Sequence, residues 1–241
     1  MRTKELFEEV GFVGEYYSRM FDFYKDCFDS EENMIQFFAK VFKNDKNDKT
    51  PRRMMNQVQQ LVSIATDIDR IRPARDPLRI FFIKTCLEAL CKLSGERKVE
   101  FYKSFPTYLS DEGKRYILDN FSLISFDDVY LGRTYEASCN LTIDDFFEII
   151  KAVRDIVAHE GNYWEMQFFA YNTADTAWIV SLETDQKILK SYQYMCNENI
   201  IREYHFETTM QYDRFVYYFV DACISYIEAY IDKNKVRIFD E

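Results

Sequence analysis

The sequence predicts a mainly α-helical fold: an all-α helical bundle with a small β-hairpin insertion before the last helix. Only 6 Gly and 4 Pro occur among the 241 residues, so tight turns are scarce. Hydrophobic residues make up 47% of the chain, which is enough apolar material for a large core. Over most of the chain these residues recur at three- and four-residue steps, the spacing of one helix face.

Start signals for helices recur through the first half of the chain. Asp29-x-x-Glu32 forms a capping box, and Thr50-Pro51 and Asp76-Pro77 each place a capping residue before a first-turn proline. The helix that follows Asp76-Pro77 is apolar nearly all round, so we expect it to be central to the core. The helices expected in this half cover residues 4–28, 30–43, 50–72, 78–93, 97–105 and 111–121.

In the second half, residues 122–140 indicate a loop with little regular structure. Thr142-x-x-Asp145 predicts the start of a helix over 143–159, which Gly161 would end. Partial alternation of β-branched and aromatic residues over 176–183 and 200–207 predicts a hairpin within an insertion at about 163–207. A final helix is expected over 209–233, and the whole chain, 1–241, is expected to form a single domain.

Composition favours a cytoplasmic protein that does not enter a membrane. The charged amino terminus lacks the apolar stretch of a signal peptide. The longest apolar stretch, 215–227, is interrupted by Asp221 and is too short to span a bilayer. The six Cys form no CxxC pair, and scattered Cys with apolar neighbours are typical of a reducing compartment.

Charge is unevenly distributed along the chain. The net charge is −10, which argues against a protein that coats nucleic acid without specificity, yet residues 51–100 carry a net charge of +4. This excess is either a solvated helix face with some ion pairs or a local anion-binding face. Most of it comes from Arg52, Arg53, Arg70, Arg72, Arg75, Arg79 and Lys84.

No common cofactor or metal motif is present in the sequence. It contains neither a P-loop nor a G-x-G-x-x-G loop. His159-Glu160-x-x-Tyr163 begins like a zinc protease motif but has Tyr where the second His ligand belongs. We therefore expect neither a metal nor a cofactor. The other histidine, His205, falls in a predicted strand and is most simply a half-buried or edge residue.

Chemistry is indicated at one place, Arg154-Asp155-Ile156-Val157-Ala158-His159. Histidine moves protons near neutral pH, and arginine offers a fixed positive fork for phosphate. Together they are the minimum set for cleaving RNA without a metal. On a helix, residues five apart differ by roughly 140° in direction and 7.5 Å in rise, so Arg154 and His159 do not share a face. They would converge at a helix end or across a two-fold axis with a second copy.

At these residues the chain resembles the HEPN superfamily, helical-bundle proteins that carry Arg, then four to six residues, then His. Arg154, the polar Asp155 and His159 match this motif, and the resemblance covers 154–159. Membership implies a single HEPN-like domain and a metal-independent endoribonuclease. It also implies a homodimer with a composite cleft, an RNA substrate, and a toxin or phage-defence role with an antitoxin or regulatory protein. By this resemblance Arg154 binds phosphate, His159 is the acid/base group and Asp155 orients one of them.

A second interpretation stays open. Arg154 could pair with a surface acid while His159 caps carbonyls at the helix end, leaving a non-catalytic helical protein–protein interaction module. Such a module would show an exposed apolar or aromatic patch. The aromatic group beside the motif fits a core or a dimer contact better than a base-stacking platform. Its members are Tyr163, Trp164, Phe168, Phe169 and Tyr171.

Overall fold

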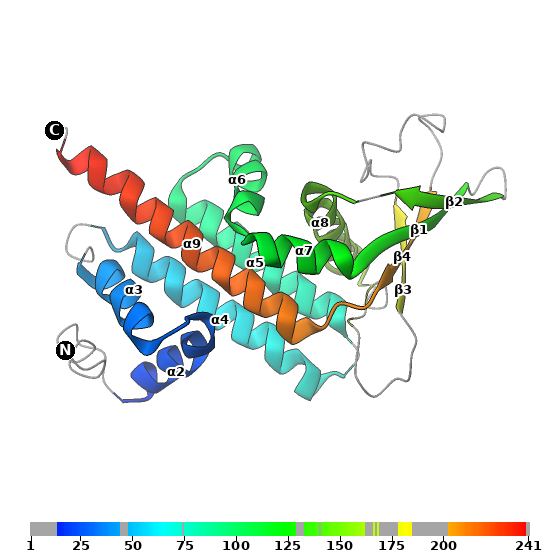
Figure 1. The fold of residues 1–241 in the computed structure, drawn as a ribbon. Coiled ribbons are helices and arrows are strands. Elements are labelled where there is room, and N and C mark those ends of the chain that lie inside the picture. Colours follow the sequence, from blue (N-terminus) through cyan, green and yellow to red (C-terminus); the bar gives the residue numbers. More distant parts are fainter. Residues whose placement is uncertain are drawn as a thin grey trace. The chain divides into compact units, whose positions relative to one another are not determined.

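The computed structural model describes residues 14–43, 48–73, 75–128, 133–139, 141–161, 166, 168, 178–184 and 202–239 (Figure 1). The described elements of the first half are α2 (Glu15–Tyr24), η1 (Lys25–Cys27), α3 (Glu31–Lys43), α4 (Thr50–Ile71), α5 (Asp76–Ser94), α6 (Lys98–Ser104), η2 (Phe105–Tyr108) and α7 (Asp111–Asp119). Those of the second half are β1 (Phe121–Asp128), β2 (Arg133–Cys139), α8 (Ile143–Glu160), β3 (Trp178–Thr184), β4 (Arg202–Thr208) and α9 (Tyr212–Phe239). The mainly α-helical class is confirmed. Among the described helices, none has the length and apolar character needed to cross a membrane.

Contacts divide the chain into two compact units, and each is assembled from separated segments. The first consists of Met1–Ser63, Cys86–Leu109 and Tyr217–Glu241, and the second of Ile64–Thr85 and Ser110–Val216. The helices α4, α5 and α9 therefore each contribute residues to both units. The single domain over 1–241 that we expected stays a prediction.

In the first unit, aromatic side chains gather around Tyr226 of α9. Its ring lies 5.3 Å from that of Phe101 and 5.2 Å from that of Tyr108, measured between centroids and edge to face in both cases. Tyr24 of α2 is fully buried and donates a hydrogen bond of 2.8 Å from its hydroxyl to the carbonyl oxygen of Met55. A buried hydroxyl needs such a partner, so this bond fixes the end of α2 against α4.

Polar contacts also connect the amino-terminal helices of the first unit to α9. The ammonium group of Lys40 lies 3.0 Å from Asp232 Oδ2 and 3.5 Å from Glu228 Oε1. Tyr230 donates a hydrogen bond of 3.1 Å to Asp48 Oδ2. These contacts join residues that are far apart in the sequence. The first unit is therefore complete only when its amino-terminal helices and α9 are both present.

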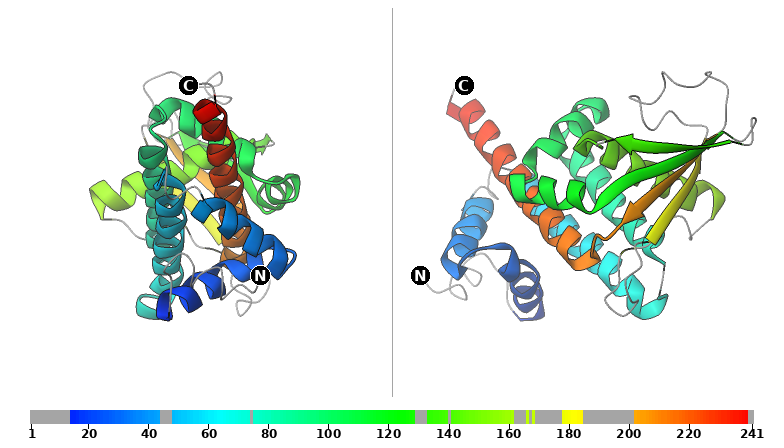
Figure 2. Two further views of the ribbon diagram at one scale, coloured as in Figure 1. Left: turned by 90° about the vertical axis from the view of Figure 1, so that its left-hand side faces the viewer. Right: turned by 45° about the vertical axis from the view of Figure 1, so that its right-hand side comes forward.

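The second unit contains an antiparallel four-stranded sheet with the strand order β2-β1-β4-β3 (Figure 2, right). Side chains alternate between its faces, as expected of a sheet that is covered on one side. Phe121, Leu123 and Phe206 are buried, whereas Ser122 and Glu207 are exposed. The register shifts between Leu123 and Ser125, which interrupts the alternation within β1.

α8 packs on the buried face of this sheet. The ring of Phe146 lies 5.3 Å from that of Phe121 on β1 and 5.9 Å from that of Phe215 on α9. Phe121 is stacked in turn on Phe206 of β4 at 5.3 Å. Edge-to-face and stacked rings at these distances are stabilising beyond their buried area, so α8, β1, β4 and α9 form one core.

Several sequence predictions can be compared with these elements. The hairpin is confirmed, since β3 and β4 pair as predicted. The loop predicted over 122–140 is wrong, because β1 and β2 lie there and complete the sheet. The capping box predicted at Asp29 is also wrong. The helix is capped one residue later, by Ser30, whose Oγ accepts the backbone N–H of Asn33. The last helix runs on to Phe239, beyond the predicted end at 233.

Both ends of α8 are defined by local signals, as the sequence predicted. Thr142 Oγ1 accepts the backbone N–H of Asp145 at 3.2 Å, and Asp145 Oδ2 accepts that of Thr142 at 2.9 Å. At the other end, Gly161 adopts φ 66° and ψ 19°, the left-handed conformation that terminates helices. These two caps determine which residues occupy the last turn of α8.

We expect Thr142→Ala to lower the free energy of unfolding by about 1 kcal/mol, because it removes the acceptor of a helix N-cap. Urea denaturation followed by circular dichroism measures the change. The matched control is Asp144→Asn, since Asp144 is an exposed acid in the same turn but lies outside the capping box. Equal losses in the two variants would contradict a specific role for the box.

Candidate functional site

α8 carries the three residues that the sequence singled out, and its apolar face holds it in place. Val153 and Val157 are buried together with Phe146, Ile149 and Ile150. Arg154 and Asp155 are partly buried, and His159 is exposed in the last turn. The helix therefore presents the motif at the boundary between the core and solvent.

Arg154 and Asp155 are in direct contact. Arg154 Nη1 donates a hydrogen bond of 2.7 Å to Asp155 Oδ1, and the two side chains are 19% and 20% exposed. Neighbouring residues on a helix do not normally face each other, so the long arginine side chain must turn along the surface to make this bond. The contact fixes one end of the guanidinium while the pair stays within reach of solvent.

His159 lies in the last turn of α8, one residue before the helix ends at Glu160. Within the residues that the structure describes, its imidazole makes no hydrogen bond or ion pair, and its side chain is exposed. An exposed imidazole that is not held by a carboxylate is accessible to a ligand on either ring nitrogen. His159 is thus open to an incoming group, whereas Arg154 is already bound to Asp155.

Arg154 and His159 are not brought together within one chain. α8 is continuous from Ile143 to Glu160, so the two residues keep helical spacing. Five positions correspond to roughly 7.5 Å along the axis and 140° around it. The structure joins Arg154 to Asp155 and, among the described residues, places no contact between His159 and either of them.

The other residues that drew attention in the sequence have simpler roles. His205 is half-buried on β4, between the register positions of Ser125 on β1 and Ser181 on β3. Phe168 is buried and stacks on Phe215 with centroids 5.6 Å apart, so it belongs to the core. The remaining aromatic residues of that group, Tyr163, Trp164, Phe169 and Tyr171, lie outside the described residues.

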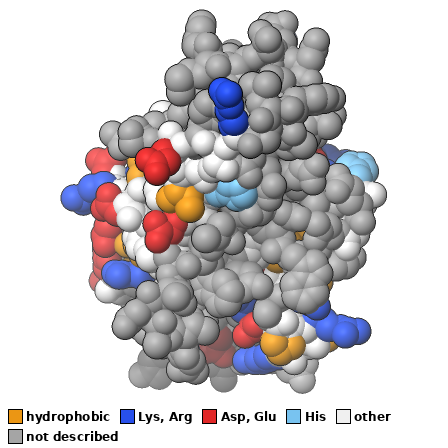
Figure 3. Space-filling model, turned by 90° about the vertical axis from the view of Figure 1, so that its right-hand side faces the viewer, with side chains coloured by type: hydrophobic (Ala, Val, Ile, Leu, Met, Phe, Trp, Pro, Cys, Tyr) orange, Lys and Arg blue, Asp and Glu red, His pale blue; other side chains and the backbone are white. Residues whose placement is uncertain are grey.

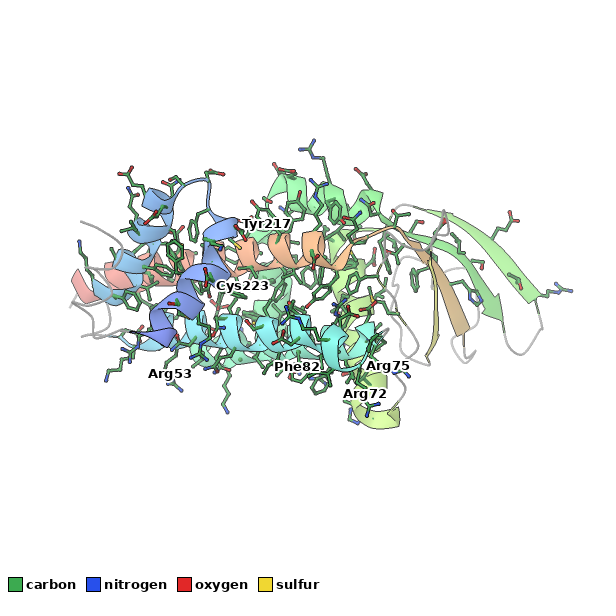
Figure 4. All side chains as sticks on the ribbon, turned by 90° about the horizontal axis from the view of Figure 1, so that it is seen from below. Arg53, Arg72, Arg75, Phe82, Tyr217 and Cys223 are labelled. Carbon is green, nitrogen blue, oxygen red and sulfur yellow. The ribbon has the colours of Figure 1, made fainter. Side chains whose placement is uncertain are left out.

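The basic excess of residues 51–100 is divided between the two units. Arg52 and Arg53 belong to the first unit and the other five residues to the second. Arg70 is 3.4 Å from Asp67, and Lys84 is buried. Arg72 and Arg75 project from the α4–α5 corner, and Arg53 from the first turns of α4 (Figure 4). Arg72 and Arg53 are exposed and make no ion pair with any described residue.

One polar group was missed by the sequence interpretation. Asp76 is buried and accepts hydrogen bonds from Arg79 and from the backbone N–H of Phe168. We used Asp76 only as a helix start signal. The sequence did contain one indication that Asp76 and Arg79 would be buried together. They are three residues apart at the start of a helix that is otherwise apolar.

Three cysteines of the first unit are buried, Cys86, Cys91 and Cys223, and Cys27 is half-buried. Cys86 and Cys223 are fully buried, and burial raises the pKa of the Cys223 thiol, labelled in Figure 4, well above its ordinary value. Burial, with smaller contributions from Asp221 and Asp26, also raises the pKa of Cys27 to about 12. A thiol in this state carries little thiolate. Among the described residues, no three His, Cys, Asp or Glu side chains are grouped to hold a metal ion.

Two surface features bear on binding. On the face shown in Figure 3, both acidic and basic side chains are visible among the described residues, and they do not form one continuous basic surface. On α4, Ile64 and Ile71 are 43% and 70% exposed, with the half-buried Ile68 between them. Residues spaced by four and three positions lie along one helix face, so these side chains form an apolar stripe on the second unit.

Comparison with known proteins leaves the family undetermined. Neither protein-family models, nor curated proteins, nor solved structures match the chain.

Proposed function

We propose that this chain is a HEPN-type, metal-independent endoribonuclease that works in the cytoplasm in a toxin or defence role. The supporting observation is the arrangement on α8: an exposed His159 in the last turn, preceded by a partly buried Arg154 that is held by Asp155. These are the residue types that phosphodiester cleavage without a metal requires, and capping signals define the helix that carries them.

In the proposed reaction, His159 takes the proton from a ribose 2′-OH, and the 2′ oxygen attacks the adjacent phosphorus. The bond from phosphorus to the 5′ oxygen breaks, and an imidazolium returns a proton to that leaving oxygen. Arg154 neutralises the charge that builds on the non-bridging oxygens. Asp155 keeps the guanidinium from turning away, because their 2.7 Å bond engages Nη1. The products are a 2′,3′-cyclic phosphate and a 5′-hydroxyl.

The active form is a homodimer with a composite site. Within one copy Arg154 and His159 keep helical spacing and point in different directions. A two-fold axis near the end of α8 would bring the Arg154 of one copy towards the His159 of the other. An antitoxin or regulatory protein would then act by covering this site.

A second candidate, a non-catalytic helical interaction module, is favoured by the stripe of Ile64, Ile68 and Ile71 on α4. Ile64 is 43% exposed and Ile71 is 70% exposed. Exposed large apolar side chains along one helix face are typical of a helix that binds a partner. The contact between Arg154 and Asp155 is equally compatible with a structural ion pair.

We expect the wild-type protein to cut a labelled RNA pool in EDTA and to leave 2′,3′-cyclic phosphate ends. His159→Ala and Arg154→Ala should each lower the rate at least about 100-fold, because each removes a group that acts in the transition state. Gel analysis of end-labelled products measures this. The matched control is His205→Gln, which replaces the other histidine and should leave the rate unchanged. An inert wild-type dimer, or equal losses in all three variants, would contradict the proposal.

We expect Arg72→Gln to weaken RNA binding without changing the maximal cleavage rate, since Arg72 is an exposed arginine of the unit that carries α8 and, in our proposal, attracts phosphate without taking part in the chemistry. The salt dependence of binding should fall by about one counterion. Fluorescence anisotropy across a salt series measures it. Arg53→Gln, at the other end of α4, is the matched control. A Kd that is insensitive to Arg72→Gln would show that the α4–α5 corner does not contact RNA.

If the stripe on α4 mediates self-association, Ile64→Asp combined with Ile71→Asp should lower the molar mass in solution, because charges would then enter an apolar contact. Sedimentation equilibrium at several concentrations measures the mass. Val99→Asp is the control, since Val99 is 81% exposed but lies on α6 in the first unit. An unchanged mass in the double variant would exclude the stripe as the contact between copies.

A further inference from the structure

The stripe on α4, formed by Ile64, Ile68 and Ile71, has the spacing of the contact face of a coiled coil. Its members are separated by four and then three positions, as are the core positions of a seven-residue repeat. Ile68 then takes position a, and Ile64 and Ile71 take position d. All three belong to the second unit, and Ile71 is 70% exposed. In coiled coils a second helix covers a face of this kind.

Charged residues of opposite sign flank the stripe. In the same repeat Asp67 takes position g and Arg72 takes position e, the two positions beside the apolar seam. The Asp67 side chain is 54% exposed, and Arg72 projects from the α4–α5 corner (Figure 4). The backbone N–H of Arg72 donates a hydrogen bond of 2.7 Å to the carbonyl oxygen of Ile68. Arg72 therefore keeps the helical register of α4.

A second copy of the chain in parallel orientation would complement these charges. When two identical helices pair in parallel, position g of one lies beside the position e that is five residues further along the other. Asp67 of each copy would then face Arg72 of the other, and the two-fold symmetry would form the pair twice. Antiparallel pairing centred on the stripe would instead bring the two Asp67 side chains together. The charge pattern therefore favours a second copy, and the parallel orientation.

Both charged groups are available for such a contact. Arg72 is exposed and makes no ion pair with any described residue. Asp67 lies 3.4 Å from Arg70, whose side chain is 82% exposed. Exposed pairs of this kind contribute little to stability, and a carboxylate has a second oxygen that can accept another cation. An unrelated helix would have to supply both charges at the right spacing, whereas a second copy already carries them.

The surroundings of the stripe leave room for one partner helix. Ile at both core positions also permits three or four strands in free-standing coiled coils. Ala65, at position e of the preceding turn, is fully buried, so the core of the chain itself occupies that flank. The contact would run from Ile64 to Arg72, roughly 12 Å of helix. A stable dimer buries about 800 Å² on each copy, so a contact of two turns should give association that depends on concentration.

We propose that α4 is a self-association helix: two copies pair in parallel along the stripe, with Asp67 of each copy beside Arg72 of the other. This inference does not rest on the proposed ribonuclease function. It names the partner of the stripe that the second candidate function leaves open. The proposed cleavage site needs a two-fold axis near the end of α8, whereas this contact places one alongside α4. A protein that used two such contacts on different axes would assemble beyond a dimer.

Charge reversal tests the pairing. Arg72→Glu and Asp67→Lys each replace two opposite-charge contacts by two like-charge contacts, so we expect each to raise the Kd of self-association about tenfold. The double variant restores opposite charges and should return to within about twofold of the wild-type Kd. Sedimentation equilibrium at several concentrations measures the Kd. Arg115→Glu is the matched control, because Arg115 is an exposed arginine of the second unit that lies on α7.

A single cysteine tests the orientation. In a parallel pair position 71 of one copy meets position 71 of the other, so Ile71→Cys should form a disulfide-linked dimer under mild oxidation, seen on a non-reducing gel. In an antiparallel pair position 71 lies opposite position 64, and only Ile64→Cys combined with Ile71→Cys would link two copies there. The wild type, which has six Cys of its own, is the control.

Four outcomes would overturn the proposal. They are a wild-type chain that is monomeric at every concentration, a Kd that neither single reversal changes, a double variant that associates as weakly as the single ones, and a link that needs cysteines at both 64 and 71. RNA cleavage is not a readout of these experiments. An inert wild-type protein would therefore remove the proposed ribonuclease function without deciding how α4 associates.

Discussion

The second unit depends on an unbroken series of contacting rings that starts in the sheet and ends at α9. Each ring touches the next at stacking or edge-to-face distance, so β4, β1, α8 and the start of α9 contribute to the same core. Removing a ring of this size leaves a cavity worth about 3–5 kcal/mol, because close-packed neighbours relax only in part. In order, the rings are those of Phe206, Phe121, Phe146, Phe215, Phe168 and Tyr212.

Features with local causes were predictable from the sequence. α8 was expected over 143–159 and is found over Ile143–Glu160, because the Thr142 box and Gly161 act within one turn of the residues they limit. β1 and β2 were not expected. The register shift in β1 breaks the alternation that reveals a strand, and its partner β4 lies some 80 residues further along the chain.

In the candidate site, too, the local features were predictable and the contacts between side chains were not. Residue types and spacing were enough to choose Arg154, Asp155 and His159, and to foresee that the first and last do not share a helix face. That Asp155 would hold Nη1 of Arg154 depends on side-chain packing around α8, which the sequence does not specify. Asp76 could not have been connected with Phe168, because nothing in the sequence relates positions 92 residues apart.

The interleaving of the two units determines the order in which the chain can fold during synthesis. Every residue of the second unit precedes Tyr217, whereas the first unit needs the last part of α9. Lys40 is 192 residues from its partner Asp232, which a ribosome adding about 5–20 residues per second reaches only after roughly 10–40 s. The amino-terminal helices emerge first yet are completed last, so α3, with its buried Phe37, Phe38 and Phe42, is synthesised before the α9 residues that Lys40 contacts exist. During that interval the rings lack the packing that the finished protein gives them, since all three are buried in the folded chain.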